Sequence, residues 1–209
     1  MITSPFEAMA QLFEAGLGEL GPDTLRPNVS PTQSVPVVVS HEGDRLLVPM
    51  RWGFLPHWYK APNDGPLLIN ARAETIADKP AFRAAARVRR CLLPADGFYE
   101  WAGQKGAKVA HVIRPRAGGL IGLAGIWQDW RPKGGSAAMA TCAIVTCAAN
   151  GVLAPIHDRM PVIVAPEDFG LWLGEAGDGA ARLMEPAPEE MLEATPADTE
   201  TRAILARRG

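Results

Sequence analysis

Residues 91–101 read CLLPADGFYEW, and this stretch has the composition of a β-strand. Aliphatic residues lead into aromatic ones, and runs of this kind between turn residues are typical of strands. The sequence therefore predicts a strand from Cys91 to Trp101. Six further stretches have the same character and are expected to be strands: Val35 to Ser40, Arg45 to Phe54, Lys108 to Arg114, Leu120 to Trp130, Ala140 to Ala149 and Met160 to Ala165.

The predicted strands outnumber the predicted helices, and Gly, Pro, Asn and Asp separate them at short intervals. This pattern predicts an α+β fold whose core is a mostly antiparallel, strongly curved, barrel-like β-sheet with a few peripheral helices. A length of 209 residues fits one domain over residues 1–209, without an internal repeat or a long linker. The tail after about residue 176 is rich in Ala, Pro and Glu, so its end is expected to be poorly ordered.

The clearest helical pattern covers residues 4–16. Ser4 and Glu7 have the spacing of a capping box, Pro5 suits the first helical position, and Gly16 could end the helix. Two shorter helices are expected at residues 80–88 and 166–174.

The net charge of −2 does not indicate a dedicated nucleic-acid binder, because such proteins usually carry a large basic excess. A local basic patch could still bind phosphate, since these contacts act at short range. Arg83, Arg87 and Arg90 would share one face if the helix at 80–88 continues that far. That face could contact phosphate, or it could simply be solvated.

Composition places the chain among globular proteins, with 47% hydrophobic and 21% charged residues. We find no apolar run of bilayer length and no signal-peptide pattern, and therefore expect a cytoplasmic protein without a membrane partner. Cys91, Cys142 and Cys147 are an odd set without CxxC spacing, which argues against a disulfide framework and a structural zinc site. We expect them to be reduced core residues.

Standard catalytic signatures are absent from the sequence. There is no P-loop, no G-x-S-x-G, no H-E-x-x-H and no G-x-G-x-x-G after a strand. The chain has four histidines, and they do not have the spacing of metal ligands on one element. We therefore expect neither a metal ion nor a cofactor.

Three polar residues stand out within apolar, turn-bounded segments: Asn70, Glu100 and His157. A carboxylate between aromatic residues can be desolvated, which raises its pKa and suits it to acid–base work. A histidine can move protons near neutral pH, and an asparagine can orient a substrate without adding charge. Each also has an ordinary interpretation, because Glu100 could point outward from a strand, His157 could sit in a loop beside Asp158, and Asn70 could cap a turn.

Several motifs resemble those of the SOS-response-associated peptidase (SRAP) family, in the order in which that family has them. The closer matches are MRWGFLPHW (50–58), INARAET (69–75), CLLPADGFYEW (91–101) and IHDRMP (156–161), and the looser ones are LAGIW (123–127) and RPNVSP (26–31). Together they cover roughly residues 4–170. Four motifs in one order are far more specific than any single one.

The resemblance implies an SRAP-like fold and an abasic-site processing protein. In that family the reacting group is a cysteine directly after the initiator methionine, and its amine and thiol form a thiazolidine crosslink with the ring-opened aldehyde of an abasic site. By resemblance, Glu100 moves protons during imine formation and ring closure. His157 assists opening of the sugar, and Asn70 holds the reacting end.

The implied partner is single-stranded DNA that contains abasic sites, bound by a monomer that associates with the nucleoid. The resemblance implies phosphate contacts by arginines and stacking or wedging by aromatic side chains. For Trp52, packing in the hydrophobic core is an equally weighted alternative to contact with a base. The implied DNA-binding residues are Arg72, Arg159, Trp52, Trp58, Phe98 and Asn28.

The sequence departs from the family at both ends. It starts Met1-Ile2-Thr3-Ser4-Pro5, without the family's methionine–cysteine–glycine–arginine opening, and its first cysteine is Cys91. The family's proline–valine–serine and valine–asparagine elements are not evident after residue 190. Three functions therefore stay open: a crosslinking enzyme (lyase, with autoproteolytic peptidase activity) whose front residues are missing from this sequence, a non-covalent single-stranded DNA-binding module, and a peptidase-type hydrolase.

Overall fold

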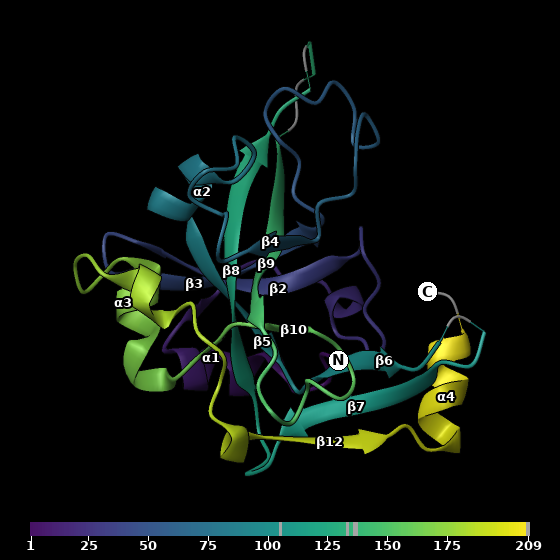
Figure 1. Cartoon of the computed structure of the whole chain (residues 1–209). Coiled ribbons are helices and arrows are strands. Elements are labelled where there is room, and N and C mark those ends of the chain that lie inside the picture. Colours follow the sequence, from purple (N-terminus) through teal and green to yellow (C-terminus); the bar gives the residue numbers. More distant parts are fainter. Residues whose placement is uncertain (105, 133, 136–137, 208–209) are drawn as a thin grey trace.

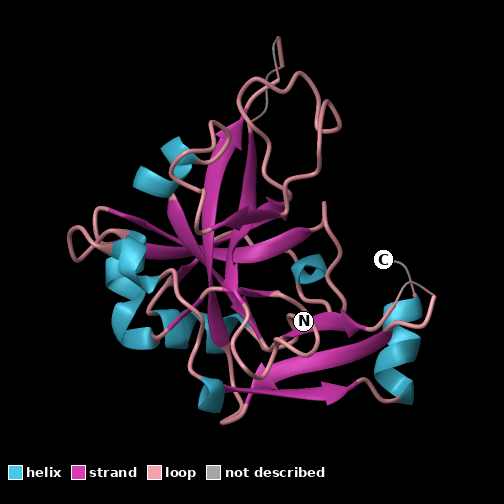
Figure 2. Ribbon diagram, viewed as in Figure 1, coloured by secondary structure: helices cyan, strands magenta, loops and turns pink. Residues whose placement is uncertain are grey.

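The structure, a computed structural model, describes residues 1–104, 106–132, 134–135 and 138–207. Within these residues the strands form two sheets, and the helices lie around them (Figures 1 and 2). The larger sheet has the order β1 (Gly16–Leu17), β3 (Asp44–Trp52), β2 (Ser34–His41), β5 (Arg90–Ala95), β8 (Ile121–Trp130), β9 (Met139–Ala148), β10 (Arg159–Pro161). β4 (Asn70–Arg72) pairs with β9, and β11 (Ile163–Val164) pairs with β8. The smaller sheet has the order β12 (Leu192–Pro196), β7 (Val109–Pro115), β6 (Phe98–Ala102).

The larger sheet curves strongly. The pairs β3–β2, β2–β5, β5–β8 and β8–β9 are all antiparallel, and β3 then meets β9 in a short parallel pairing. That pairing joins Arg51 to Thr141 and Trp52 to Cys142, so the sheet curls back on itself without forming an evenly closed barrel. Close approach inside the curve requires Gly125, where an added Cβ would lie 2.4 Å from Leu93 Cδ1. The predicted α+β class with a curved, mostly antiparallel sheet is confirmed.

The single strand predicted over Cys91 to Trp101 is wrong, because the chain breaks there into β5 and β6. The break is at Gly97, whose φ of 149° is one that L side chains rarely adopt. A Cβ at this position would lie 2.3 Å from the carbonyl oxygen of Ile113. The turn therefore sends β5 into the larger sheet and β6 into the smaller one. The strand predicted from Met160 to Ala165 is likewise divided, into β10 and β11.

The first helix, α1 (Phe6–Phe13), is shorter than predicted, and its capping differs. Pro5 is the N-cap and no side chain caps the helix. Ser4 Oγ instead donates to the Asp96 carboxylate, so the predicted capping box is wrong. The helix ends at Glu14 in the left-handed conformation, which leaves Gly16 free to begin β1.

The other predicted helices are present in shortened form, as α2 (Arg83–Val88) and α3 (Phe169–Leu173), the latter preceded by the 3-10 helix η2 (Pro166–Asp168). Arg90 does not extend α2, because it begins β5. Its guanidinium donates to the carbonyl oxygens of Trp172, Ala86 and Arg87, so it links β5 to α2 and α3. The predicted three-arginine face therefore does not form.

Helices α1 and α3 pack on the sheet through a shared aromatic contact. Phe13 and Phe169 are stacked with ring centroids 4.6 Å apart, and both are buried. Trp172 Nε1 donates to the carbonyl oxygen of Cys91 at 2.8 Å, which ties α3 to β5. All three cysteines are buried and free, as predicted.

The tail forms regular elements as far as it is described, and residues 208–209, at the end that was expected to be poorly ordered, lie outside the described residues. These elements are the 3-10 helices η3 (Ala180–Leu183) and η4 (Glu189–Met191), strand β12 and helix α4 (Thr199–Ala206); the remaining short element, η1 (Pro22–Thr24), lies near the front of the chain. β12 pairs antiparallel with β7, and Leu192 at its start is fully buried. Asp198 accepts from the Thr201 amide and caps α4. In the described part of the chain, no helix is long and apolar enough to span a bilayer.

Candidate active site

A cavity of about 410 Å³, which we call the polar cleft, lies between the two sheets. Asn70, Glu100 and His157 all line it, although they are far apart in sequence. The cleft thus brings together the three residues that the sequence analysis selected, while their catalytic roles stay predictions. The remaining lining residues are Trp52, Ile69, Arg72, Phe98, Tyr99, Trp101, Leu123, Ile144, Thr146, Arg159, Met160 and Pro161.

Strand β9 positions two sides of the polar cleft. β4 runs parallel to it, with Asn70 opposite Ile144. β10 runs antiparallel to the last residues of the same strand, so the segment that carries His157 returns beside it. Because β4 and β10 both pair with residues 144–148, their polar side chains are held at one end of β9.

Glu100 comes from the other sheet, on β6, and is half-buried. Desolvation raises the pKa of its carboxyl, while the nearby His157 and a backbone hydrogen bond act in the opposite direction. A carboxyl with a raised pKa in a cavity is suited to giving and taking protons near neutral pH. The position of this residue therefore fits the acid–base role predicted for it.

The His157 ring is oriented by its own segment. Its Nδ1 accepts the backbone N–H of Arg159 at 3.0 Å, and Asp158 Oδ1 lies 3.3 Å away. Nδ1 also lies 3.2 Å from the Arg159 carbonyl oxygen, so whether it donates or accepts depends on the tautomer of the ring. The side chain is 42% exposed, so it can still exchange protons with solvent or substrate.

The two predicted phosphate-binding arginines differ in their surroundings. Arg72 is exposed at the end of β4 and lines the polar cleft. Arg159 also lines it, but it forms an ion pair with Glu74 and is only 20% exposed. Arg72 is therefore the more accessible of the two cations.

The predicted aromatic contacts do not all lie at the polar cleft. Trp52 and Phe98 line it, and Trp52 Nε1 donates to the Ile69 carbonyl oxygen at 3.0 Å. Trp58 is not among the lining residues; it is 46% exposed and meets the His57 ring edge-on at 4.9 Å. The structure thus brings Trp52 and Phe98 to the predicted site and leaves Trp58 on a separate surface.

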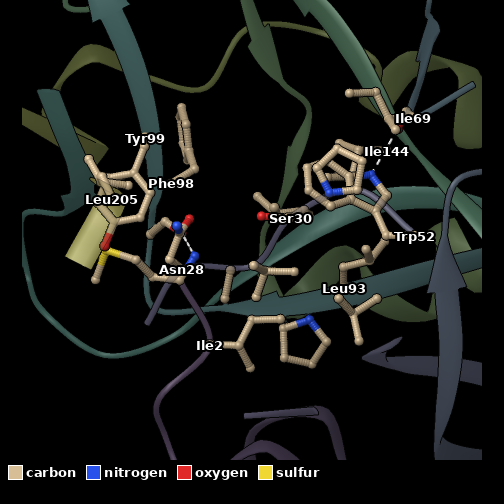
Figure 3. A pocket seen from close by; sticks show the side chains of 18 of the residues that line it. Ile2, Asn28, Ser30, Trp52, Ile69, Leu93, Phe98, Tyr99, Ile144 and Leu205 are labelled. Carbon is tan, nitrogen blue, oxygen red and sulfur yellow. Dashed lines mark hydrogen bonds between the residues drawn. The ribbon is translucent and has the colours of Figure 1, made fainter. Parts of the chain in front are cut away.

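A second cavity of about 430 Å³, which we call the apolar cavity, adjoins the polar cleft. The two share the lining residues Trp52, Ile69, Phe98, Tyr99, Trp101, Leu123 and Ile144. In Figure 3, Phe98, Tyr99 and Leu205 face Trp52 and Ile69 across this space. The predicted DNA-binding residue Asn28 lies here, beside Ser30, rather than in the polar cleft. The apolar cavity therefore borders the polar cleft and has part of its wall in common with it.

The amino terminus also reaches the apolar cavity. The Met1 amine donates to the Gly97 carbonyl oxygen at 3.0 Å, and burial lowers the pKa of this amine to about 6, against an opposing effect of Asp96. Asp96 fixes the following residues, since its carboxylate accepts the amides of Thr3 and Ser4 at 2.6 and 3.1 Å. The first residues of this chain are thus held at the wall of the apolar cavity with a largely neutral amine at pH 7.

The sequence analysis did not identify three residues that line the two cavities or hold the segments around them. Trp101 lines both cavities and is 42% exposed, yet its position inside a strand motif gave no sign of this. Glu74 and Asp96 act through partners 85 and 92–93 positions away, a distance that no local pattern reveals. The presence of both residues inside the quoted motifs was the one available signal.

Comparison with known proteins agrees with these motifs. The sequence matches the profile of the family described as SOS response associated peptidase (SRAP) over residues 1–203. It is 35% identical over 171 residues to the abasic site processing protein YoqW of Bacillus subtilis (strain 168), covering 80% of this chain and 76% of YoqW. Identity to the abasic site processing protein HMCES of Mus musculus is 31% over 209 residues, covering 79% of this chain and 59% of HMCES.

Solved structures share the fold. A protein of Bordetella bronchiseptica superposes with a TM-score of 0.78 at 23% identity, covering 94% of this chain and 97% of the other. A protein of Bacteroides thetaiotaomicron superposes with a TM-score of 0.73 at 26% identity, covering 81% of this chain and 75% of the other. On the family profile and the identity to its relatives, this chain belongs to the SOS response associated peptidase (SRAP) family.

Proposed function

We propose that this protein processes abasic sites in single-stranded DNA. The observation that carries the proposal is the polar cleft, in which Asn70, Glu100 and His157 meet in a member of a family whose relatives are named abasic site processing proteins. An abasic site exposes an aldehyde when its sugar opens. The polar cleft offers a general acid–base pair and an amide beside a hollow wide enough for such a group.

The proposed chemistry uses a terminal cysteine that this chain does not carry. Its amine adds to the aldehyde carbon and water leaves, which gives an imine. The thiol then adds to the imine carbon and its proton passes to the nitrogen, which closes a thiazolidine. Glu100 would carry protons in both steps, His157 would assist opening of the sugar, and Asn70 would hold the reacting end.

The apolar cavity supports this proposal, because Met1 lines it and it borders the polar cleft. Each extended residue spans roughly 3.3–3.6 Å, so a few residues placed before Met1 would reach across it. We define the extended protein as this chain with methionine–cysteine–glycine–arginine added before Met1 and the added methionine then removed, so that the cysteine is the terminal residue. Its reacting terminus would then approach the polar cleft through the apolar cavity.

Recognition of DNA is proposed to combine phosphate contacts with stacking. Arg72 and Arg159 would bind phosphates, and Trp52, Phe98 and Asn28 would meet bases near the lesion. Trp58, on its separate exposed surface, would stack on a base farther along the strand. Single strands suit this arrangement, because their bases are free to stack on aromatic rings.

Replacing Arg72 with alanine should weaken binding to single-stranded DNA of any sequence by about tenfold at low salt, because a charge-assisted hydrogen bond to phosphate is lost. The slope of log affinity against log salt should become shallower by about 0.7, the value expected for one phosphate contact on a single strand. Fluorescence anisotropy with two unrelated oligonucleotides at several salt concentrations measures both quantities.

The matched control is Arg182→Ala, which removes the same charge from an exposed position outside the polar cleft. It should leave affinity within about twofold of the parent. An equal loss in the two variants would mean that net charge, not the polar cleft, governs binding. Salt-insensitive binding by the parent would contradict the proposed phosphate contacts.

Non-covalent binding is the second candidate function for the chain as given. The observation that favours it is the burial of all three thiols, which leaves the described residues without an accessible thiol nucleophile. On this alternative the protein binds single-stranded DNA at the polar cleft and forms no lasting bond. A heat-stable crosslink by the extended protein, or its absence, separates the two candidates.

A further inference from the structure

The proposed chemistry leaves one charged residue of the INARAET motif without a role. Glu74 binds Arg159 through two parallel hydrogen bonds, from Nη1 to Oε1 at 2.7 Å and from Nη2 to Oε2 at 2.9 Å. Two-point pairing between a guanidinium and a carboxylate fixes orientation as well as distance. The pair joins segments that are 85 positions apart in sequence.

The pair is also hydrogen-bonded to strand β9. Arg159 Nη2 donates to the Thr146 carbonyl oxygen at 2.7 Å, and the same oxygen accepts the Ala73 amide at 2.8 Å. Arg159 Nε is buried without a partner, which is unfavourable for a donor. The contacts of the two Nη atoms with Glu74 and Thr146 therefore hold this arginine in place.

Each end of the pair leads directly to the polar cleft. Glu74 follows Asn70 by four residues, in the turn after β4. The backbone amide of Arg159 donates to His157 Nδ1 at 3.0 Å. The ion pair thus connects the segment that carries Asn70 with the segment that carries His157, across the end of β9.

We propose that Glu74 is a positioning residue, whose ion pair with Arg159 fixes Asn70 and His157 relative to each other. This proposal rests on the proposed function for its effect on rate, and on geometry alone for its effect on the His157 ring. Hydrogen bonds from Arg159 lower the pKa of the Glu74 carboxyl, so the pair stays ionised through the neutral range. Misplacement of a reacting group by about 1 Å can slow a reaction about a hundredfold.

The rate test uses the extended protein. Glu74→Gln should slow crosslinking at saturating abasic DNA by about ten- to a hundredfold. Affinity for an unreactive single strand should stay the same or rise, because a negative charge near the phosphates is removed. Glu74→Asp, which keeps the charge on a shorter side chain, should recover part of the rate. The exposed control Glu185→Gln should change neither quantity.

The second test needs no crosslinking, so it separates this proposal from the proposed function. In the chain as given, Glu74→Gln should shift or broaden the nitrogen NMR signals of the His157 ring, while Glu185→Gln should leave them unchanged. If the extended parent fails to crosslink but the ring signals respond, only the proposed function is overturned. If the ring signals do not respond, or if Glu74→Gln loses affinity and rate in equal proportion, Glu74 is not a positioning residue.

Discussion

The extended protein should form a heat-stable crosslink with an abasic single-stranded oligonucleotide, and the chain beginning at Met1 should form none. The difference expected on a denaturing gel is all or nothing. A thiazolidine needs an amine and a thiol on one terminal residue, and the amino-terminal residue of the chain as given is methionine, which has no thiol. Extensions of four, five and six residues should be compared, because the reacting terminus has to cross the apolar cavity to reach the polar cleft.

The internal cysteines cannot supply the missing thiol. Cys91, Cys142 and Cys147 are buried and lack a neighbouring α-amine. Burial raises the pKa of the Cys142 thiol to about 12 and that of Cys147 to about 11, so little thiolate exists at neutral pH. A lone thiol would in any case add reversibly to an aldehyde.

The matched control carries serine in place of the added cysteine. It keeps the amine, so it should give only an imine, which survives denaturation after reduction with borohydride and not otherwise. The Met1 amine of the chain as given has a pKa of about 6 and is largely neutral at pH 7, so any imine that it forms should show the same dependence on borohydride. A borohydride-independent crosslink from the chain beginning at Met1 would show that the nucleophile is misidentified.

The predictable part of the fold is the part that local pattern determines. Every strand of the larger sheet that is longer than three residues lies in an apolar run between turn residues, and was predicted from that pattern. The break at Gly97 was missed because CLLPADGFYEW is apolar on both sides of a single turn, and only packing against Ile113 shows why the chain must bend there. Strands β4 and β12 were missed because their pairing partners, not their composition, make them strands.

In the candidate site, too, some features could be predicted from local sequence and others depend on long-range contacts. The residue types of Asn70, Glu100 and His157 drew attention in their segments, while family resemblance supplied their order and roles. The side-chain partners could not be predicted from the sequence. Ser4 donates a hydrogen bond to Asp96 instead of capping the helix, and Glu74 pairs with Arg159 across the end of β9. Such contacts depend on which segments the sheet brings together, and that is set by long-range pairing.

Replacing Glu100 with glutamine in the extended protein should slow crosslinking by about a hundredfold to ten-thousandfold, the usual contribution of a general acid–base group. Glutamine keeps the size and hydrogen-bonding shape of the side chain but cannot transfer a proton. Affinity for an unreactive single strand should stay the same or rise, since the carboxyl is proposed to act on the aldehyde and its negative charge near the phosphates is removed. Single-turnover gels at saturating DNA measure the rate, and Glu185→Gln is the matched exposed control.

The pH dependence gives an independent check on the same residue. Burial raises the pKa of the Glu100 carboxyl, so the parent should lose the carboxylate-dependent rate as pH falls through a value above the ordinary 4.5. The pH–rate profile of the glutamine variant should lack this decline at low pH.

The contribution of Glu100 to the free energy of unfolding should depend on pH in the opposite sense to the rate. A raised carboxyl pKa means that the folded state favours the protonated form, so its contribution is fully present at low pH and is lost as pH rises through the folded pKa. Glu100→Gln should therefore melt at a higher temperature than the parent at pH 7 and at an equal one near pH 4. A variant that reacts slowly because it is misfolded would melt lower at both pH values, and equal crosslinking rates in the two proteins would remove Glu100 from the proposed chemistry.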